Sequence, residues 1–151
     1  MSLLNLSLNE LHKRLTAGEI TASDLTEASL ERIQEVDDVV GAFLLVDEEG
    51  VREKARELDE RLQDSERIGS LTALPVGIKD NISTEGLKTT CASEMLANYI
   101  PIYNATVIDK LMDAQALVIG KVNMDEFAMG SSTESSAFKR TTNPWDTERS
   151  P

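Results

Sequence analysis

The chain has 151 residues, of which 40% are apolar, and this suffices for one domain with a buried core or for part of one. Fifteen basic and twenty-seven acidic residues give a net charge of −12, which repels phosphate backbones and anionic lipids. The composition therefore argues against direct nucleic-acid or membrane binding. Cys91 is the single cysteine, so an internal disulfide is excluded. With no signal-like N-terminus and no long apolar run, we expect a soluble, cytoplasmic protein.

The first third of the sequence predicts two helices. Residues 7–10 (SLNE) form a capping box before apolar residues at helical spacing, and Gly18 is placed to end that helix. A second cap at residues 21–24 begins a helix that we expect to end near Asp37. Together they predict a helical hairpin over residues 1–37.

Strands and helices alternate over residues 38–151. Strands are predicted at 39–46, from Leu74 to Lys79 and at 116–120, and residues 64–70 predict a surface loop. Helices are predicted after Asp47, near 93–98, at 105–114 and at 123–126. This alternation is typical of an α/β fold, with a parallel or mixed sheet covered by helices.

Lys79 is the first candidate functional residue, because it lies at the end of an apolar strand. At the rim of a core, desolvation disfavours the ammonium form, and the amine can then act as a general base. Alternatively, a lysine at the end of a strand extends its charge into water. The residues alone leave both interpretations open.

Six separated stretches agree in order and spacing with one known family. They are PVGIKDN (75–81), TTCAS (89–93), NATV (104–107), IGKVNMDEFAMG (119–130), SSTESSAF (131–138) and NPWDTERSP (143–151). Together they resemble the N-terminal part of the amidase signature family. Within that family, they are most similar to the A subunits of bacterial glutamyl-tRNA(Gln)/aspartyl-tRNA(Asn) amidotransferases. The resemblance covers nearly the whole chain.

The resemblance implies a serine hydrolase without histidine, in which a lysine, a serine in a cis peptide and a nucleophilic serine relay a proton. By motif match the catalytic lysine is Lys79, and Met129 and Ser131 line the substrate pocket. Asp80 and Asn81 are expected to orient the strand end. In the family, both serines follow the segment matched by residues 149–151, so we expect the 151-residue chain alone to be inactive.

The resemblance also implies partners and cofactors. Proteins of this kind free ammonia from glutamine or asparagine, for a partner that amidates mischarged tRNA. B and C subunits would complete a heterotrimer, with ATP, Mg²⁺ and tRNA bound chiefly by the partner and no cofactor bound by this segment. Two alternatives are a stand-alone amidase for small amides and a non-catalytic interaction module.

The remaining residues of interest have structural roles and no expected part in the reaction. Cys91 has no histidine near it in sequence, so we interpret it as a small buried thiol, and no metal site is expected. The chain also departs from the family pattern at two places. Gln115 stands where the family has glycine, and Lys139-Arg140 replaces the commoner Gly-Pro.

Overall fold

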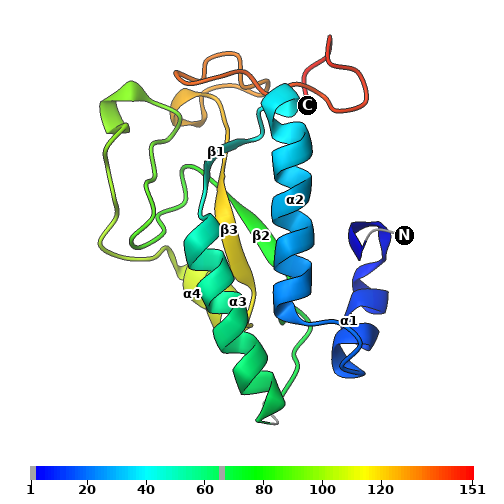
Figure 1. Ribbon diagram of the computed structural model, residues 1–151. Helices are drawn as coiled ribbons and strands as arrows, with labels where there is room; N and C mark the ends of the chain where they lie inside the picture. Colours follow the sequence, from blue (N-terminus) through cyan, green and yellow to red (C-terminus); the bar gives the residue numbers. More distant parts are fainter. Residues whose placement is uncertain (1–2, 65–66) are drawn as a thin grey trace. The chain divides into compact units, whose positions relative to one another are not determined.

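The computed structural model describes residues 3–64 and 67–151, and Figure 1 shows their arrangement along the chain. Residues 65–66 of the predicted loop at 64–70 lie outside the described residues. The elements in order are η1 (Leu3–Asn5), α1 (Leu8–Thr16), α2 (Ala22–Val40), β1 (Phe43–Val46), α3 (Glu48–Gln63), β2 (Pro75–Lys79), η2 (Glu94–Leu96), α4 (Thr106–Asp113), β3 (Leu117–Val122) and η3 (Glu126–Ala128).

The chain divides into two compact units, each made of several segments. One comprises Met1–Ile33, Asp47–Val76 and Lys110–Ile119, and the other comprises Gln34–Val46, Gly77–Asp109 and Gly120–Pro151. The predicted α/β fold class is confirmed, since helices and strands alternate in the order expected after the helical hairpin.

Helix α1 begins and ends at the predicted residues. The Ser7 hydroxyl oxygen accepts the Glu10 backbone N–H at 3.3 Å. At the other end Gly18 has a φ of 69°, and the N–H groups of Gly18 and Glu19 donate to the carbonyls of Leu15 and Arg14. This is the double hydrogen bond with which a left-handed glycine closes a helix. No helix within 3–64 and 67–151 is long and apolar enough to cross a membrane.

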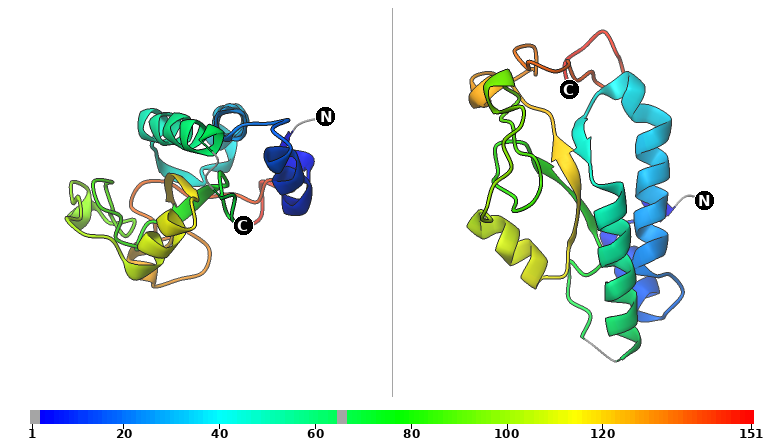
Figure 2. Two further views of the ribbon diagram at one scale, coloured as in Figure 1. Left: turned by 90° about the horizontal axis from the view of Figure 1, so that it is seen from below. Right: turned by 60° about the vertical axis from the view of Figure 1, so that its left-hand side comes forward.

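The N-terminal part of α2 packs beside α3, as Figures 1 and 2 show. Asp59 of α3 accepts the backbone N–H groups of Ala22 and Ser23 at 2.6 and 3.0 Å, and thereby caps α2. Arg52 of α3 pairs with Glu27 of α2 at 2.8 Å. The buried apolar side chains of the two helices are Ala22, Leu25, Leu30, Val51, Ala55 and Leu58.

The sheet has three strands in the order β1-β3-β2. Strand β1 is antiparallel to β3, with Phe43 opposite Val122 and Val46 opposite Gly120. On the other side of β3, Leu117 N–H donates to the Leu74 carbonyl and Asp80 N–H donates to the Val122 carbonyl. Since the starts and the ends of β2 and β3 are thus paired, these two strands run parallel and the sheet is mixed.

The predicted strand at 39–46 begins too early, because α2 continues to Val40. Gly41 has a φ of 68° and ends the helix. The Asp37 carboxylate then accepts the N–H groups of Ala42 and Phe43 at 2.7 and 3.2 Å. This side chain holds the turn that leads into β1, a role that the apolar pattern does not reveal.

Candidate active site

Lys79 is the last residue of β2, as predicted, but its side chain is exposed. Of the two interpretations that the sequence left open, the described residues show the second, in which the amine extends into water. The cause is the alternation of a strand, in which successive side chains point to opposite faces. Ile78 and Asp80 are buried, at 4% and 1% exposure, and Lys79 lies between them on the other face. The amine is therefore on the open side of the sheet.

Asp80, the neighbour of Lys79, organises the 90–92 turn (Thr90, Cys91 and Ala92). Its Oδ2 atom accepts the backbone N–H of Thr90 at 2.9 Å, the Thr90 hydroxyl and the backbone N–H of Ala92 at 3.4 Å. Cys91 and Ala92 have φ values of 53° and 54°, which residues other than glycine rarely adopt. The buried carboxylate thus holds a strained turn beside the strand end, in agreement with the predicted orienting role.

Lys121 is fully buried, with 0% exposure, and it was not among the site residues predicted from the sequence. Its Nζ atom donates to the Ile82 carbonyl and the Thr89 hydroxyl, both at 2.7 Å. The Asp80 carboxylate lies 3.8 Å away. Burial lowers the pKa of Lys121, and the charge of Asp80 opposes that effect. The sequence signal was a lysine directly after the apolar residues 116–120.

Met129 and Ser131 are exposed residues of the 129–136 loop, and Met129 is 83% exposed. Asp125 holds this loop by accepting the backbone N–H groups of Ser132 and Thr133, each at 2.8 Å. The Ser135 hydroxyl also donates to Asp125 at 2.8 Å. These hydrogen bonds lower the pKa of Asp125 to about 2, and the bond from the Ser135 hydroxyl has the largest effect.

Glycine is required at position 130 because of Asp125. A Cβ atom built on Gly130 would lie 2.5 Å from the Asp125 carboxyl carbon, closer than real Cβ contacts allow. The helix predicted at 123–126 does not begin at Asn123, whose side chain does not cap it. The Asn123 side chain accepts from Met124 N–H and the Ser136 hydroxyl instead, and η3 starts after Asp125.

Backbone hydrogen bonds connect the segments that carry the predicted site residues. The Asp80 carbonyl accepts Cys91 N–H at 3.0 Å, and the Cys91 carbonyl accepts Phe127 N–H at 2.9 Å. Phe127 belongs to η3, which leads directly into the 129–136 loop. The Ser93 hydroxyl also donates to Glu126 at 2.5 Å. The structure therefore brings the β2 end, the 90–92 turn and η3 together.

Cys91 is half-buried, and burial, followed by the charge of Asp80, raises the pKa of its thiol. A thiol held protonated in this way is a poor nucleophile, which agrees with a structural role. Within the described ranges, no group of three or more His, Cys, Asp or Glu residues is placed to hold a metal ion.

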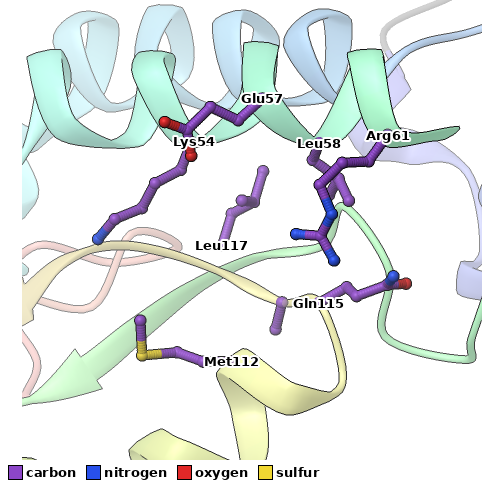
Figure 3. Close-up of a pocket in the computed structure, with 8 residues that line it drawn as sticks. Lys54, Glu57, Leu58, Arg61, Met112, Gln115 and Leu117 are labelled. Carbon is purple, nitrogen blue, oxygen red and sulfur yellow. The ribbon is translucent and has the colours of Figure 1, made fainter. Parts of the chain in front are cut away.

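Each of the two compact units has a pocket of its own. One pocket, of about 360 Å³, is lined by Leu44, Lys88, Thr90, Ala97, Phe138 and Lys139, and it includes one residue of the 90–92 turn. Another, of about 220 Å³, lies where α3, the end of α4 and the start of β3 meet, and Figure 3 draws its lining side chains. Lys54, Glu57 and Arg61 of α3 line it opposite Met112 and Gln115, and it contains none of the predicted site residues.

The structure places Lys79 at a strand end, as predicted, and adds a buried aspartate beside it that holds a threonine-cysteine turn. The family model described as Amidase matches residues 24–151, and the chain belongs to this family. The predicted family membership is confirmed.

Within this family, the chain is similar in sequence and structure to several individual proteins. The chain is 55% identical over 151 residues to the A subunit of glutamyl-tRNA(Gln) amidotransferase from Geobacillus thermodenitrificans (strain NG80-2), and it spans 31% of that protein. The crystal structure of the corresponding protein from Thermotoga maritima is 42% identical, with a TM-score of 0.76, over 97% of this chain and 29% of the other. Native peptide amidase from Stenotrophomonas maltophilia is 30% identical, with a TM-score of 0.86, over 95% and 31%.

Proposed function

We propose that the complete protein is the amide-hydrolysing component of a tRNA-dependent amidotransferase, which releases ammonia from glutamine or asparagine. The observation that carries the proposal is the 55% identity, along the whole chain, to the A subunit of a glutamyl-tRNA(Gln) amidotransferase. The chain spans about a third of the length of the relatives that it matches, so the activity belongs to the protein as a whole.

In this proposal Lys79 is the general base. Its neutral amine takes a proton through a bridging serine from a nucleophilic serine, and the nucleophile attacks the amide carbon. The same lysine then returns the proton to the leaving ammonia. Both serines would come from sequence beyond residue 151. The same sequence would cover the exposed side of β2 and exclude water from the Lys79 amine. Met129 and Ser131 would contact the substrate from the 129–136 loop.

The partner proteins would supply the remaining chemistry. We propose a cytoplasmic heterotrimer with B and C subunits, in which ATP, Mg²⁺ and tRNA bind chiefly to the partner. The net charge of −12 of this chain supports placing the tRNA contacts on a partner.

A second candidate function is a stand-alone amidase that acts on small or peptide amides. The TM-score of 0.86 with the peptide amidase from Stenotrophomonas maltophilia favours it, since the two folds agree closely over this segment.

Ammonia release by the complete protein distinguishes the two functions. The protein would be assayed alone and with its two partner proteins, on glutamine, asparagine and a C-terminal peptide amide. We expect glutamine or asparagine hydrolysis by the assembled protein, and amidation of mischarged tRNA when ATP and Mg²⁺ are added. Efficient hydrolysis of the peptide amide by the protein alone, without tRNA amidation by the assembly, would favour the second function.

A further inference from the structure

Lys121 is a buried cation with no role in the proposed reaction. It lies in β3, where its neighbours Val118 and Ile119 are buried and apolar. Removing an ammonium group and a carboxylate from water is costly, and a protein with apolar residues of similar volume in their place is often no less stable. The presence of a fully buried lysine in such a strand is therefore not explained by a gain in the stability of the protein.

The hydrogen bonds that the Lys121 side chain donates all go to the segment that follows Lys79. Its Nζ atom donates to the Ile82 carbonyl and to the Thr89 hydroxyl at 2.7 Å, and the Thr84 hydroxyl lies 3.5 Å away. Ile82 lies near the start and Thr89 at the end of the segment that connects β2 to the 90–92 turn. The ammonium group thus holds the two ends of this segment together.

Asp80 connects this point to the 90–92 turn. Its Oδ2 atom binds Thr90 and Ala92, whereas its Oδ1 atom accepts no hydrogen bond from any residue that the structure describes. Oδ1 lies instead 3.8 Å from the Lys121 Nζ atom. Lys121 is the cation that compensates this buried oxygen, so the carboxylate that holds the strained turn depends on it.

The Lys79 backbone lies within this network. The Lys79 carbonyl accepts Ile82 N–H at 3.0 Å, and the next residue, Asp80, donates its N–H to the Val122 carbonyl at 3.0 Å. Ile82 is therefore bonded both to Lys79, through its N–H, and to Lys121, through its carbonyl. Lys121 constrains the backbone on which the Lys79 amine is carried, although no bond joins the two side chains among the described contacts.

We propose that Lys121 is a positioning residue for amide hydrolysis. Its buried ammonium group fixes Ile82, Thr89 and Asp80, and through them the backbone at Lys79 and the 90–92 turn. The proposal rests on the proposed function, since it assigns Lys79 as the base. A misplacement of about 1 Å in a reacting group can lower a rate by about 100-fold, so such a residue affects turnover without contacting substrate.

The test uses the complete, assembled enzyme and a matched pair of variants at Thr89. Thr89→Val removes the acceptor of the Lys121 hydrogen bond at nearly constant volume, and Thr89→Ser keeps it. We expect Thr89→Val to lower kcat for glutamine by about 10-fold or more with little change in KM, because a loosened Lys121 network would misplace the reacting groups, and a shift of about 1 Å can cost about 100-fold. Thr89→Ser should keep near-normal kcat.

Thr26→Val is the control for replacing a buried threonine. Thr26 is fully buried in α2, and its hydroxyl oxygen has no partner among the described residues. This variant should leave kcat unchanged. Lys121→Met and the double variant Lys121→Met/Asp80→Asn extend the test. If the two residues act as one unit, the double variant should lose no more kcat than the Lys121→Met variant.

All rates would be measured well below the thermal midpoint of each variant. Thr89→Val and Lys121→Met enzymes with wild-type kcat would overturn the positioning role, even if their melting temperatures fall. Failure of the wild-type assembly to release ammonia from glutamine or asparagine would instead overturn the proposed function. The two failures are therefore distinguishable in one set of assays.

Discussion

Many of the acidic residues of this chain bind backbone N–H groups. Asp37 holds the turn into β1, Asp47 caps α3 through Gly50, and Asp59 caps α2. Asp80 and Asp125 do the same for the 90–92 turn and the 129–136 loop. A carboxylate that accepts charge-assisted hydrogen bonds in this way is a strong local constraint. Part of the excess negative charge is therefore structural.

Asp125 should make the protein sensitive to acid. Its pKa in the folded protein is about 2, below the value of about 3.9 for an aspartate in an unfolded chain. A depressed pKa contributes stability that is fully present above about pH 5 and is lost as the pH falls toward about 2. We expect Asp125→Asn to lower Tm at neutral pH, and the difference from wild type to shrink as the pH is lowered.

The control is Asp109→Asn, at an exposed position on α4. Melting curves of the complete protein between about pH 7 and pH 3 span the window in which Asp125 titrates. A difference between Asp125→Asn and wild type that stays constant over this range would show that the charge of Asp125 does not hold the loop.

The sequence predicted the position of Lys79 at a strand end, but it did not predict Lys121. Strand and motif are local properties, and Lys79 could be located from residues 74–81 alone. The burial of Lys121 depends on Ile82, Thr89 and Asp80, which lie 32 to 41 positions earlier in the sequence. Only the pairing of β2 with β3 brings them to Lys121. Exposure of Lys79 likewise depends on strand register and on what covers the sheet.

At the level of elements, helix ends were predictable where the cap lies within a few residues of the end. Ser7, Thr21 and Asp47 cap the helices that follow them, as expected. The end of α2 was missed because residues 39–46 form one apolar run, although Gly41, with a φ of 68°, is a local signal that ends the helix after Val40. Gln115, where the family has glycine, has a φ of 63°, so this departure places a side chain in a conformation that favours glycine.

Replacing Gly18 would show how much the end of helix α1 contributes to the stability of the protein. Its φ is 69° and no atom lies within 4 Å of a Cβ built on it, so Gly18→Ala changes backbone conformational energy and introduces no clash. We expect a loss of about 1 kcal/mol in the free energy of unfolding, since alanine is disfavoured by about 1–2 kcal/mol in the left-handed region.

Gly69→Ala is the matched control, because Gly69 lacks a positive φ and a Cβ there meets only the Thr72 hydroxyl oxygen at 3.5 Å. It should change the free energy of unfolding by less than about 0.5 kcal/mol or stabilise slightly. Chemical denaturation of both variants gives the comparison. Equal effects at the two glycines would contradict the capping role of Gly18.

At the scale of the whole molecule, the chain exposes large apolar side chains. Met95, Ile102 and Trp145 are 85%, 87% and 95% exposed, and Met129 is similar. Over residues 3–64 and 67–151 the sheet has three strands, with β1 and β2 at its edges. Such surfaces are typical of protein that another segment covers, and exposed edges promote association.

We therefore expect the isolated 151-residue chain to self-associate or to unfold without a sharp transition. Light scattering coupled to size-exclusion chromatography, over a range of concentrations, would detect the association. A monomer with one cooperative thermal transition at high concentration would contradict this expectation, and it would favour a self-contained module over part of a larger enzyme.

The central claim is that Lys79 is the general base of an amide-hydrolysing enzyme. The most direct measurement is ammonia release from glutamine by the complete, assembled protein carrying Lys79→Ala, with Lys110→Ala, another exposed lysine, as the control. Because Lys79 is exposed in this segment, its loss should leave the fold intact and lower kcat by about 100- to 10,000-fold. Near-normal turnover by Lys79→Ala would contradict the assignment.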